Sequence, residues 1–580
     1  MVNDNTAWRR RLVICCDGTW QSSVSSKDNI PSNVARLCRL IARVGTDKDD
    51  ASKKFHQIVY YDSGIGTGNL STSERRRQGG TGAGLAENVI EAYNFIVQNY
   101  EPGDEIFCFG FSRGAYTARA VAGLVSDIGV IAPVNMQFFP ELYRLYQRNE
   151  EGVEFRETNE YRWFTKGKLS EKGLRMEKEG VDVRNIDWHD LKLLAEVWDI
   201  RPHGELAVSE GSRKVKVVGV WDTVGSLGVP DLIGIDLAWS RTKYGFHNVE
   251  LTENIEHAFQ ALALDERRKA FRPTLWYIPK DLVDDPNRPT PELKQVWFPG
   301  VHTNIGGGSQ DAFGDMKGDS ENISTATLCW MLQVISPHLT IDRHAFQLSM
   351  DQYTRWLFRL RFACTYHHQN FLQKAWNLLP KISIPGIGHD TLKPPPRSPP
   401  HSHTNFDFSW GTGPLVDSYS GIYYFIGSWQ RMPGHEEVEC YNEDTKAPKW
   451  TKLRDLGDTN EYIHPIAYYR HLVRGWDKHS PLKHNWNRGN WRTKEDDTAK
   501  FWWYKDNEQE KGAIPEWIMM PDGPADEYNY ERMWYNKCEE VAGIMDKSVG
   551  KEEFRGKGFL ENLDKEIDLG VDGMPKDVAP

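Results

Sequence analysis

Apolar residues in the first third of the chain fall into patterns that alternate between strand and helix. Short continuous apolar runs, each closed by turn residues, predict buried strands over residues 12–16, 55–61 and 105–109. Apolar residues spaced three and four apart predict helices over residues 34–44, 85–100 and 115–125. Strands that alternate with helices are typical of a parallel sheet covered on both faces. The pattern therefore predicts an α/β fold with a mostly parallel sheet.

A charged segment interrupts this pattern, which then resumes. Residues 150–210 are dominated by charged side chains and are interpreted as a polar insertion. Apolar runs predict further strands over residues 215–221 and 293–298, and we expect a helix around residues 253–264. The sheet is thus expected to continue beyond the insertion.

The composition changes after residue 364. Residues 384–403 are rich in proline, and the chain beyond them is rich in tryptophan. We therefore expect an α/β-hydrolase catalytic domain over residues 9–364. Residues 365–580 are expected to form a C-terminal cap or accessory region, attached through the proline-rich linker.

Charge and cysteine content restrict the class of protein. The 580 residues have a formal net charge of −11, which argues against a nucleic-acid partner because phosphate binding requires a basic surface. The eight cysteines include no CxxC pair, so no zinc ribbon or thioredoxin-like site is predicted, and their sparseness suits a reducing compartment. No apolar run is long enough to span a bilayer. We expect a cytoplasmic protein.

The most informative stretch is a strand-to-helix junction around Ser112. The motif Gly110-x-Ser112-x-Gly114 follows the apolar run 105–109 and precedes a helical pattern. A serine on such a tight turn needs small neighbours, and its hydroxyl projects over the edge of the sheet. We therefore predict that Ser112 is the nucleophile of a serine hydrolase.

Two further polar residues follow predicted strands in the chain order that α/β-hydrolases use. Asp222 comes directly after the run 215–221, and His302 lies in a glycine-rich loop four residues after Phe298. A serine nucleophile needs a base, and the base needs an acid to orient it. Asp222 and His302 are the candidates for the acid and the base.

Several of these motifs together resemble one known family. The motifs are Asp17-Gly18-Thr19-Trp20, Tyr61-Asp62-Ser63-Gly64-Ile65-Gly66-Thr67, Gly110-Phe111-Ser112-Arg113-Gly114-Ala115 and Gly300-Val301-His302-Thr303-Asn304-Ile305-Gly306-Gly307-Gly308. In this order they resemble the DUF2235 family, over about residues 9–340. That family includes the catalytic domain of bacterial type VI secretion phospholipase effectors (Tle1-like) and many fungal members, and this chain resembles the fungal type.

The resemblance implies ester hydrolysis, of phospholipid acyl esters in the secreted bacterial members, by a triad of Ser112, Asp222 and His302. One departure is visible, because Asn304 stands where the family loop usually has an aspartate. The run Gly427–Gly434 and the stretch around His464 also resemble the tail of fungal members. His464 satisfies the same chain order and is an alternative base.

The expected mechanism passes through an acyl-enzyme whose oxyanion accepts hydrogen bonds from backbone N–H groups. The donors are expected to be Arg113 together with Gly18 or Thr19, if the loop after the first strand lies beside the elbow. Asp17 is interpreted as a brace for that loop.

No cofactor and no metal is predicted. The pairs His367-His368 and His401-x-His403 lack partners at ligand spacing, and residues 311–319 lack a calcium-loop pattern. Residues 79–84 are rich in glycine but follow no strand, so a loop near the active site is favoured over a nucleotide site.

The expected partner is a small-molecule or lipid ester. Apolar residues 371–379 are compatible with a lid, a peripheral membrane contact or a buried helix. Two other functions stay open: an amidase or thioesterase with the same triad, and a non-catalytic binding protein on a hydrolase scaffold.

Overall fold

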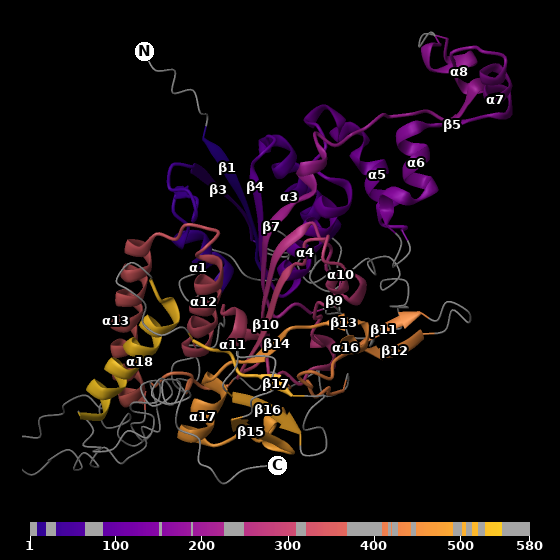
Figure 1. The fold of residues 1–580 in the computed structure, drawn as a ribbon. Coiled ribbons are helices and arrows are strands. Elements are labelled where there is room, and N and C mark those ends of the chain that lie inside the picture. The colour runs from indigo at the N-terminus through magenta and orange to yellow at the C-terminus, as the bar shows by residue number, and fades with distance from the viewer. Residues whose placement is uncertain are drawn as a thin grey trace, which may run out of the picture.

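The computed structural model describes residues 8–18, 31–63, 85–149, 154–186, 190–224, 249–308, 321–367, 409–415, 419, 427–441, 448–490, 501–505, 513–519 and 528–547. An eight-stranded sheet lies at its centre (Figure 1), in the order β14-β10-β8-β7-β4-β1-β3-β2. All neighbouring pairs are parallel except β2 and β3. The strands are β1 (Arg9–Cys16), β2 (Val44–Thr46), β3 (Lys54–Asp62), β4 (Glu105–Phe111), β7 (Val215–Trp221), β8 (Ile255–Ala263), β10 (Glu292–Phe298) and β14 (Glu461–Ile463). The predicted α/β fold is confirmed.

Helices cover both faces of this sheet, so alternate strand residues enter two separate cores. In β1, Leu12 and Ile14 belong to one core, and Val13 and Cys15 belong to the other. The first core includes α3 (Leu85–Asn99), α4 (Arg113–Ile128) and α5 (Phe139–Tyr146). The second includes α1 (Asn33–Leu40), α12 (Asn322–Ile335), α13 (Arg343–His367) and α18 (Tyr530–Lys547). Burial on both faces explains why the strands are continuous apolar runs in the sequence.

The helix expected over residues 253–264 was a wrong prediction, because this segment is strand β8. It lies between β7 and β10 in the interior of the sheet. Phe259 and Ala261 pack on one face and Ala258 on the other, so the strand shows no alternation of apolar and polar residues. Its alanine and leucine content favours a helix locally, and the pairing with two neighbouring strands overrides that preference.

Much of the C-terminal region packs at the end of the sheet where the parallel strands finish, whereas α18 joins α12 and α13 in one helical layer (Figure 1). Strand β14 extends the central sheet by pairing with β10. Trp297 of β10 packs with Ile463, Trp503 and other residues of this region. The region also contains β11 (Glu437–Tyr441), β12 (Pro448–Lys452), α16 (Leu453–Leu456), β13 (Gly457–Asp458), α17 (Ile466–Arg474), β15 (Trp486–Asn490), β16 (Phe501–Lys505) and β17 (Ile514–Pro515). The division of the chain at residue 364 stays a prediction.

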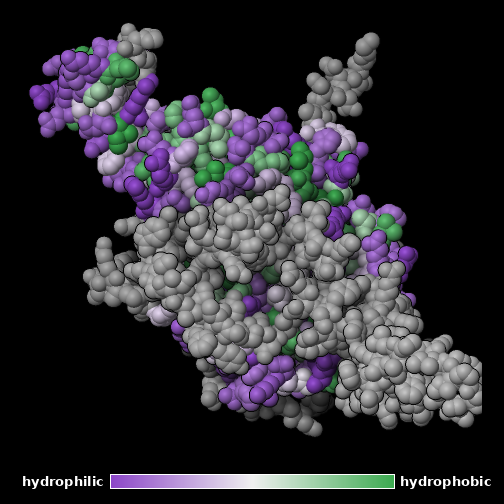
Figure 2. All heavy atoms as spheres, turned by 180° about the vertical axis from the view of Figure 1, so that it is seen from behind, coloured by the Kyte–Doolittle hydropathy of each residue, from purple (hydrophilic) through white to green (hydrophobic). Residues whose placement is uncertain are grey.

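The segment interpreted as an insertion forms a helical arm that projects from the rest of the molecule (Figure 1). It contains α6 (Asn159–Lys166), β5 (Lys168–Leu169), α7 (Glu171–Lys178), α8 (Leu191–Val197) and β6 (Trp198–Ile200). Val197 and Trp198 belong to a small core of its own. Hydrophilic residues cover most of the arm's surface, with separate hydrophobic spots (Figure 2).

The described helices include none that is both long and apolar enough to cross a membrane.

Candidate active site

Ser112 lies at a strained turn between β4 and α4. It has φ 58° and ψ −121°, a conformation that costs a non-glycine residue about 1–3 kcal/mol. A Cβ atom on Gly110 would lie 2.3 Å from the carbonyl oxygen of Gly114, and one on Gly114 would lie 2.2 Å from that of Cys16. The backbone therefore packs too closely at both positions for any side chain. The sequence motif has the geometry of a nucleophile elbow.

The loop after β1 lies beside this turn, as expected. A Cβ atom on Gly18 would lie 3.4 Å from the Cβ of Ser112. Asp17 is buried and accepts hydrogen bonds from Ser32 Oγ at 2.6 Å and Tyr61 OH at 2.7 Å. It also accepts the N–H of Gly18 at 2.7 Å, so that N–H is already engaged. Asp17 thus braces the loop, and Thr19 lies outside the described residues.

His302 and Asp222 come together at the same edge of the sheet. His302 is the first residue of α11 (His302–Gly306), four residues after the end of β10, and Asp222 directly follows β7. His302 Nδ1 lies 2.7 Å from Asp222 Oδ2, and both side chains are buried. Among the described residues, His302 Nε2 has no hydrogen-bond partner. A buried, unpaired ring nitrogen is energetically costly, and a catalytic role is one explanation for keeping it.

Phe111, the residue before Ser112, connects this pair to the elbow. Its ring centroid lies 4.8 Å from that of His302. A Cβ atom on Gly306 would lie 2.0 Å from the Phe111 ring, so α11 packs directly on the end of β4. The structure thus places the histidine beside the serine turn. Ser112 Oγ forms no hydrogen bond with Nε2, and such bonds are often long or poorly aligned in unliganded sites.

Burial and neighbouring charges set the ionisation of the pair in opposite ways. Burial lowers the pKa of His302, and the hydrogen bond to Asp222 opposes that shift. For Asp222, burial alone would raise the pKa, but the Arg431 guanidinium and His302 together hold it well below its usual range. The neutral imidazole and the ionised carboxylate are therefore favoured, as a general base and its orienting acid require.

Arg431 was not predicted to be part of the site. Its side chain is 1% exposed and forms hydrogen bonds with both carboxylate oxygens of Asp222, at 2.5 and 3.0 Å. It also donates to the carbonyl oxygens of Ala263 and Phe271, both at 2.8 Å. The only sequence signal was its place in the glycine- and proline-flanked run Gly427–Gly434, which gives no indication of a partner.

Two acidic residues after β8 position the histidine loop, and they too were missed. Asp265 Oδ2 accepts the N–H of Gly300 at 2.6 Å. Glu266 Oε2 accepts the N–H of His302 at 3.2 Å and pairs with Arg268 at 2.8 Å. Because residues 253–264 were predicted as a helix, these carboxylates were not recognised as residues at the end of a strand.

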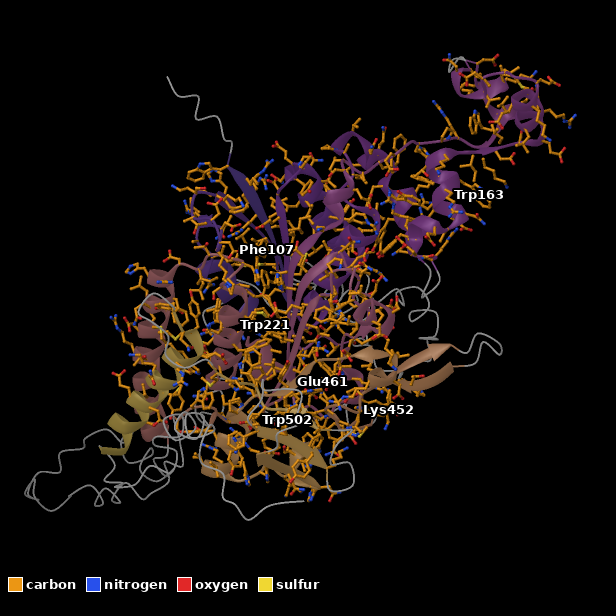
Figure 3. All side chains as sticks on the ribbon, viewed as in Figure 1. Phe107, Trp163, Trp221, Lys452, Glu461 and Trp502 are labelled. Carbon is orange, nitrogen blue, oxygen red and sulfur yellow. The ribbon has the colours of Figure 1, made fainter. Side chains whose placement is uncertain are left out.

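Figure 3 shows where this site lies in the molecule: Trp221, the residue before Asp222, is in the sheet with Phe107, far from Trp163 of the arm.

The alternative base, His464, lies elsewhere and has both ring nitrogens engaged. Its Nε2 lies 2.8 Å from Glu531 Oε1, and its Nδ1 accepts the N–H of Ile466 at 3.2 Å. The ring stacks on Phe298 with 4.5 Å between centroids. His464 is 1% exposed, so it has the surroundings of a core residue.

The remaining sequence features lie outside the described residues. These are the glycine-rich segment 79–84, the aspartates within 311–319, His368, the apolar segment 371–379 and the His401-x-His403 pair.

A strained serine turn beside a histidine–aspartate pair, at the edge of a parallel sheet, is typical of hydrolases with an α/β fold. The chain belongs to the family described as "T6SS, Phospholipase effector Tle1-like, catalytic domain", which matches residues 10–334. Ser112, Asp222 and His302 lie inside the matched segment, whereas Arg431 and His464 lie outside it.

Among curated proteins, an uncharacterized protein of Saccharomyces cerevisiae, YEL023C, is 28% identical over 153 residues. The match covers 24% of this chain and 21% of the yeast protein. Among solved structures, the Tle1 effector bound to the VgrG spike of the type 6 secretion system is 21% identical, with a TM-score of 0.27, over 52% of this chain and 51% of that chain. An uncharacterized protein from Pseudomonas aeruginosa is 16% identical, also with a TM-score of 0.27, over 57% and 46%.

Proposed function

We propose that this protein is a serine esterase that cleaves acyl esters of phospholipids through a triad of Ser112, His302 and Asp222. The observation that supports this most directly is the buried His302–Asp222 hydrogen bond of 2.7 Å, with His302 Nε2 unpaired beside the strained Ser112 turn. Asp222 fixes the tautomer that carries its proton on Nδ1, so Nε2 is the basic atom. A cytoplasmic location and a membrane contact stay predictions of the sequence.

The reaction starts when His302 Nε2 takes the proton of Ser112 Oγ. The oxygen attacks the ester carbonyl carbon, and Asp222 stabilises the charged imidazolium. His302 then gives the proton to the leaving alcohol oxygen, and the C–O bond breaks to leave an acyl-Ser112. Water, deprotonated by His302, attacks the acyl carbon; the bond to Ser112 Oγ then breaks, His302 returns the proton to Oγ, and the fatty acid is released.

The oxyanion needs backbone donors beside Ser112. Arg113 is the first residue of α4, so its N–H points along the helix axis toward developing negative charge. The N–H of Gly18 donates to Asp17, which makes Thr19 the better second donor in this loop. Arg113 and Thr19 are therefore the proposed pair.

A fluorophosphonate probe tests the activated nucleophile. Wild type should be labelled on Ser112, as read by mass spectrometry of the peptide, and Ser112→Ala and His302→Ala should lose labelling. Ser52→Ala, a change at an exposed serine in the β2–β3 turn, is the matched control and should label like wild type. Wild type that stays unlabelled, with or without detergent, would instead support a non-catalytic scaffold.

The substrate class needs a second assay. Release of fatty acid from phosphatidylcholine vesicles by wild type, but not by Ser112→Ala, would support the phospholipase proposal. A series of nitrophenyl esters of increasing acyl length separates it from a short-acyl esterase. Turnover of amide or thioester analogues in preference to esters would favour the amidase or thioesterase alternative.

A further inference from the structure

Three residues with metal-ligating side chains lie together at the end of the sheet opposite Ser112. His257 is the third residue of β8, and Glu292 is the first residue of β10, directly opposite it in the parallel register. His338 lies in the turn after α12, where its N–H donates to the carbonyl of Ile335. His257 is six residues before Ala263, so the cluster lies about 20 Å from the Asp222 site at the usual rise of a strand.

The side chains of these residues are close enough to share an ion. One ligand atom from each lies within 4.8 Å of the others. His257 Nδ1 lies 2.7 Å from Glu292 Oε2, and the His257 and His338 ring centroids are 3.8 Å apart. All three residues are partly buried. Two imidazoles and a carboxylate are the donor set of His₂Glu zinc sites, and water completes the tetrahedron there.

The three ligand atoms would need to move only slightly to bind one zinc ion. Zinc bonds of about 2.0–2.2 Å place tetrahedral ligand atoms about 3.3 Å apart, between the 2.7 Å contact and the 4.8 Å limit of the cluster. Side-chain rotation can supply this change, since none of the three residues is fully buried.

Nearby charges are balanced rather than strongly basic. Lys294 pairs with Glu292 Oε1 at 2.5 Å, and Lys216 pairs with Glu256 at 2.5 Å. Glu292 Oε2 faces the histidines and is not the oxygen that Lys294 contacts. Lys216 and Lys294 therefore each have a carboxylate partner, while Lys48 adds a further positive charge that acts on His338. One Glu292 oxygen is directed at the cluster.

We propose that His257, Glu292 and His338 form a zinc site that joins β8, β10 and the turn after α12. The site lies far from Ser112 and would tie the helical layer to the two strands, with water at its open fourth position. It goes beyond the esterase proposal and does not depend on it. No sequence motif indicates it, because the three ligands come from separate elements and only the fold brings them together.

The test is a Zn²⁺ titration of the full chain, treated with chelator and desalted, by isothermal titration calorimetry and by thermal unfolding. The Ser112→Ala chain is used, so hydrolysis cannot contribute to either signal. We expect one zinc per chain and an unfolding midpoint that rises with zinc concentration, because the ion binds the folded state. His338→Ala and Glu292→Gln should each weaken binding by roughly tenfold or more.

His344→Ala is the matched control, since His344 is an exposed histidine on α13 near the cluster in sequence. It should bind zinc like the parent chain. Circular dichroism of each variant before titration shows that it is folded, so that weaker binding is not a consequence of unfolding. The proposal is overturned if the parent chain binds no stoichiometric zinc, or if its affinity is unchanged in both His338→Ala and Glu292→Gln.

Discussion

Arg431 binds both carboxylate oxygens of Asp222 across 209 residues of chain, and both side chains are buried. The same guanidinium donates to the carbonyls of Ala263 and Phe271, so its position is fixed from several sides. Residues outside the family match thus help to orient the candidate triad acid. Asp222 Oδ1 also accepts a hydrogen bond from the N–H of Ala263, and Oδ2 also pairs with His302 Nδ1. Each carboxylate oxygen therefore has two hydrogen-bond partners.

The first prediction concerns the stability of this pair. Arg431→Met leaves the buried carboxylate of Asp222 without its main counter-charge. Asp222→Asn leaves the buried guanidinium of Arg431 without its carboxylate partner. Each substitution should lower the free energy of unfolding by about 3–5 kcal/mol. The double variant should lose less than the sum of the two, because it leaves no unpaired charge. Urea unfolding of the four proteins measures this coupling, and strictly additive losses would contradict it.

The second prediction concerns the effect of Arg431 on catalysis. Its charge holds the pKa of Asp222 low, so Arg431→Met should raise that pKa and, by leaving the carboxylate less neutralised, the pKa of His302 as well. The acid limb of the kcat/KM profile should therefore move to higher pH. Arg488→Met is the matched control. It breaks a two-bond pair with Glu516 at 2.7 and 2.8 Å, remote from the triad, and should leave the limb in place.

The parallel sheet and the elbow could be predicted because their signals are local. The continuous apolar strand ending in Gly110-x-Ser112-x-Gly114 contains both the burial and the turn within ten residues. Asp222 and His302 were selected as candidates by the same reasoning, since Asp222 directly follows β7 and His302 comes four residues after the end of β10. Their pairing depends on strand order, which sequence periodicity does not encode.

The rest of the site depends on tertiary contacts that no local pattern indicates. Strand β8 contains residues that favour a helix, so its terminal carboxylates, Asp265 and Glu266, were not recognised. Arg431 lies in a loop whose partner is distant in sequence. A charged side chain in a loop is usually exposed to solvent, and only the packing of the C-terminal region against the sheet buries this one.

The third prediction separates the two candidate bases. His302→Gln should reduce kcat by about 10³-fold or more, because the serine loses its base while the fold is kept. His464→Gln should lower stability, since it weakens the buried contact with Glu531, but leave kcat of the folded enzyme nearly unchanged. Turnover on a nitrophenyl ester, corrected for the folded fraction, decides between them; a large kcat loss in His464→Gln alone would reverse the assignment.

The fourth prediction tests the close packing at the elbow. A methyl group at Gly114 would overlap the carbonyl oxygens of Cys16 and Asp17, so Gly114→Ala should move Ser112 and abolish fluorophosphonate labelling. Gly211→Ala is the control, because its added Cβ meets nothing nearer than 3.9 Å. Labelling of Gly114→Ala at the wild-type rate would show that this turn does not position the nucleophile.

The last prediction is the pH dependence of the reaction itself. Burial lowers the pKa of His302, and Arg268 lowers it further, while Asp222 and Glu266 oppose them. The base must be neutral to act, so kcat/KM should reach half its plateau below about pH 6.5, the ordinary pKa of histidine.

Arg268→Met removes a positive charge and frees Glu266 from its ion pair, and both changes raise the pKa of His302. The acid limb should then shift to higher pH, whereas Arg288→Met, at an exposed arginine paired with Glu253, should not move it. A limb that stays in place or moves to lower pH in Arg268→Met would show that the titrating base is not the imidazole beside Asp222.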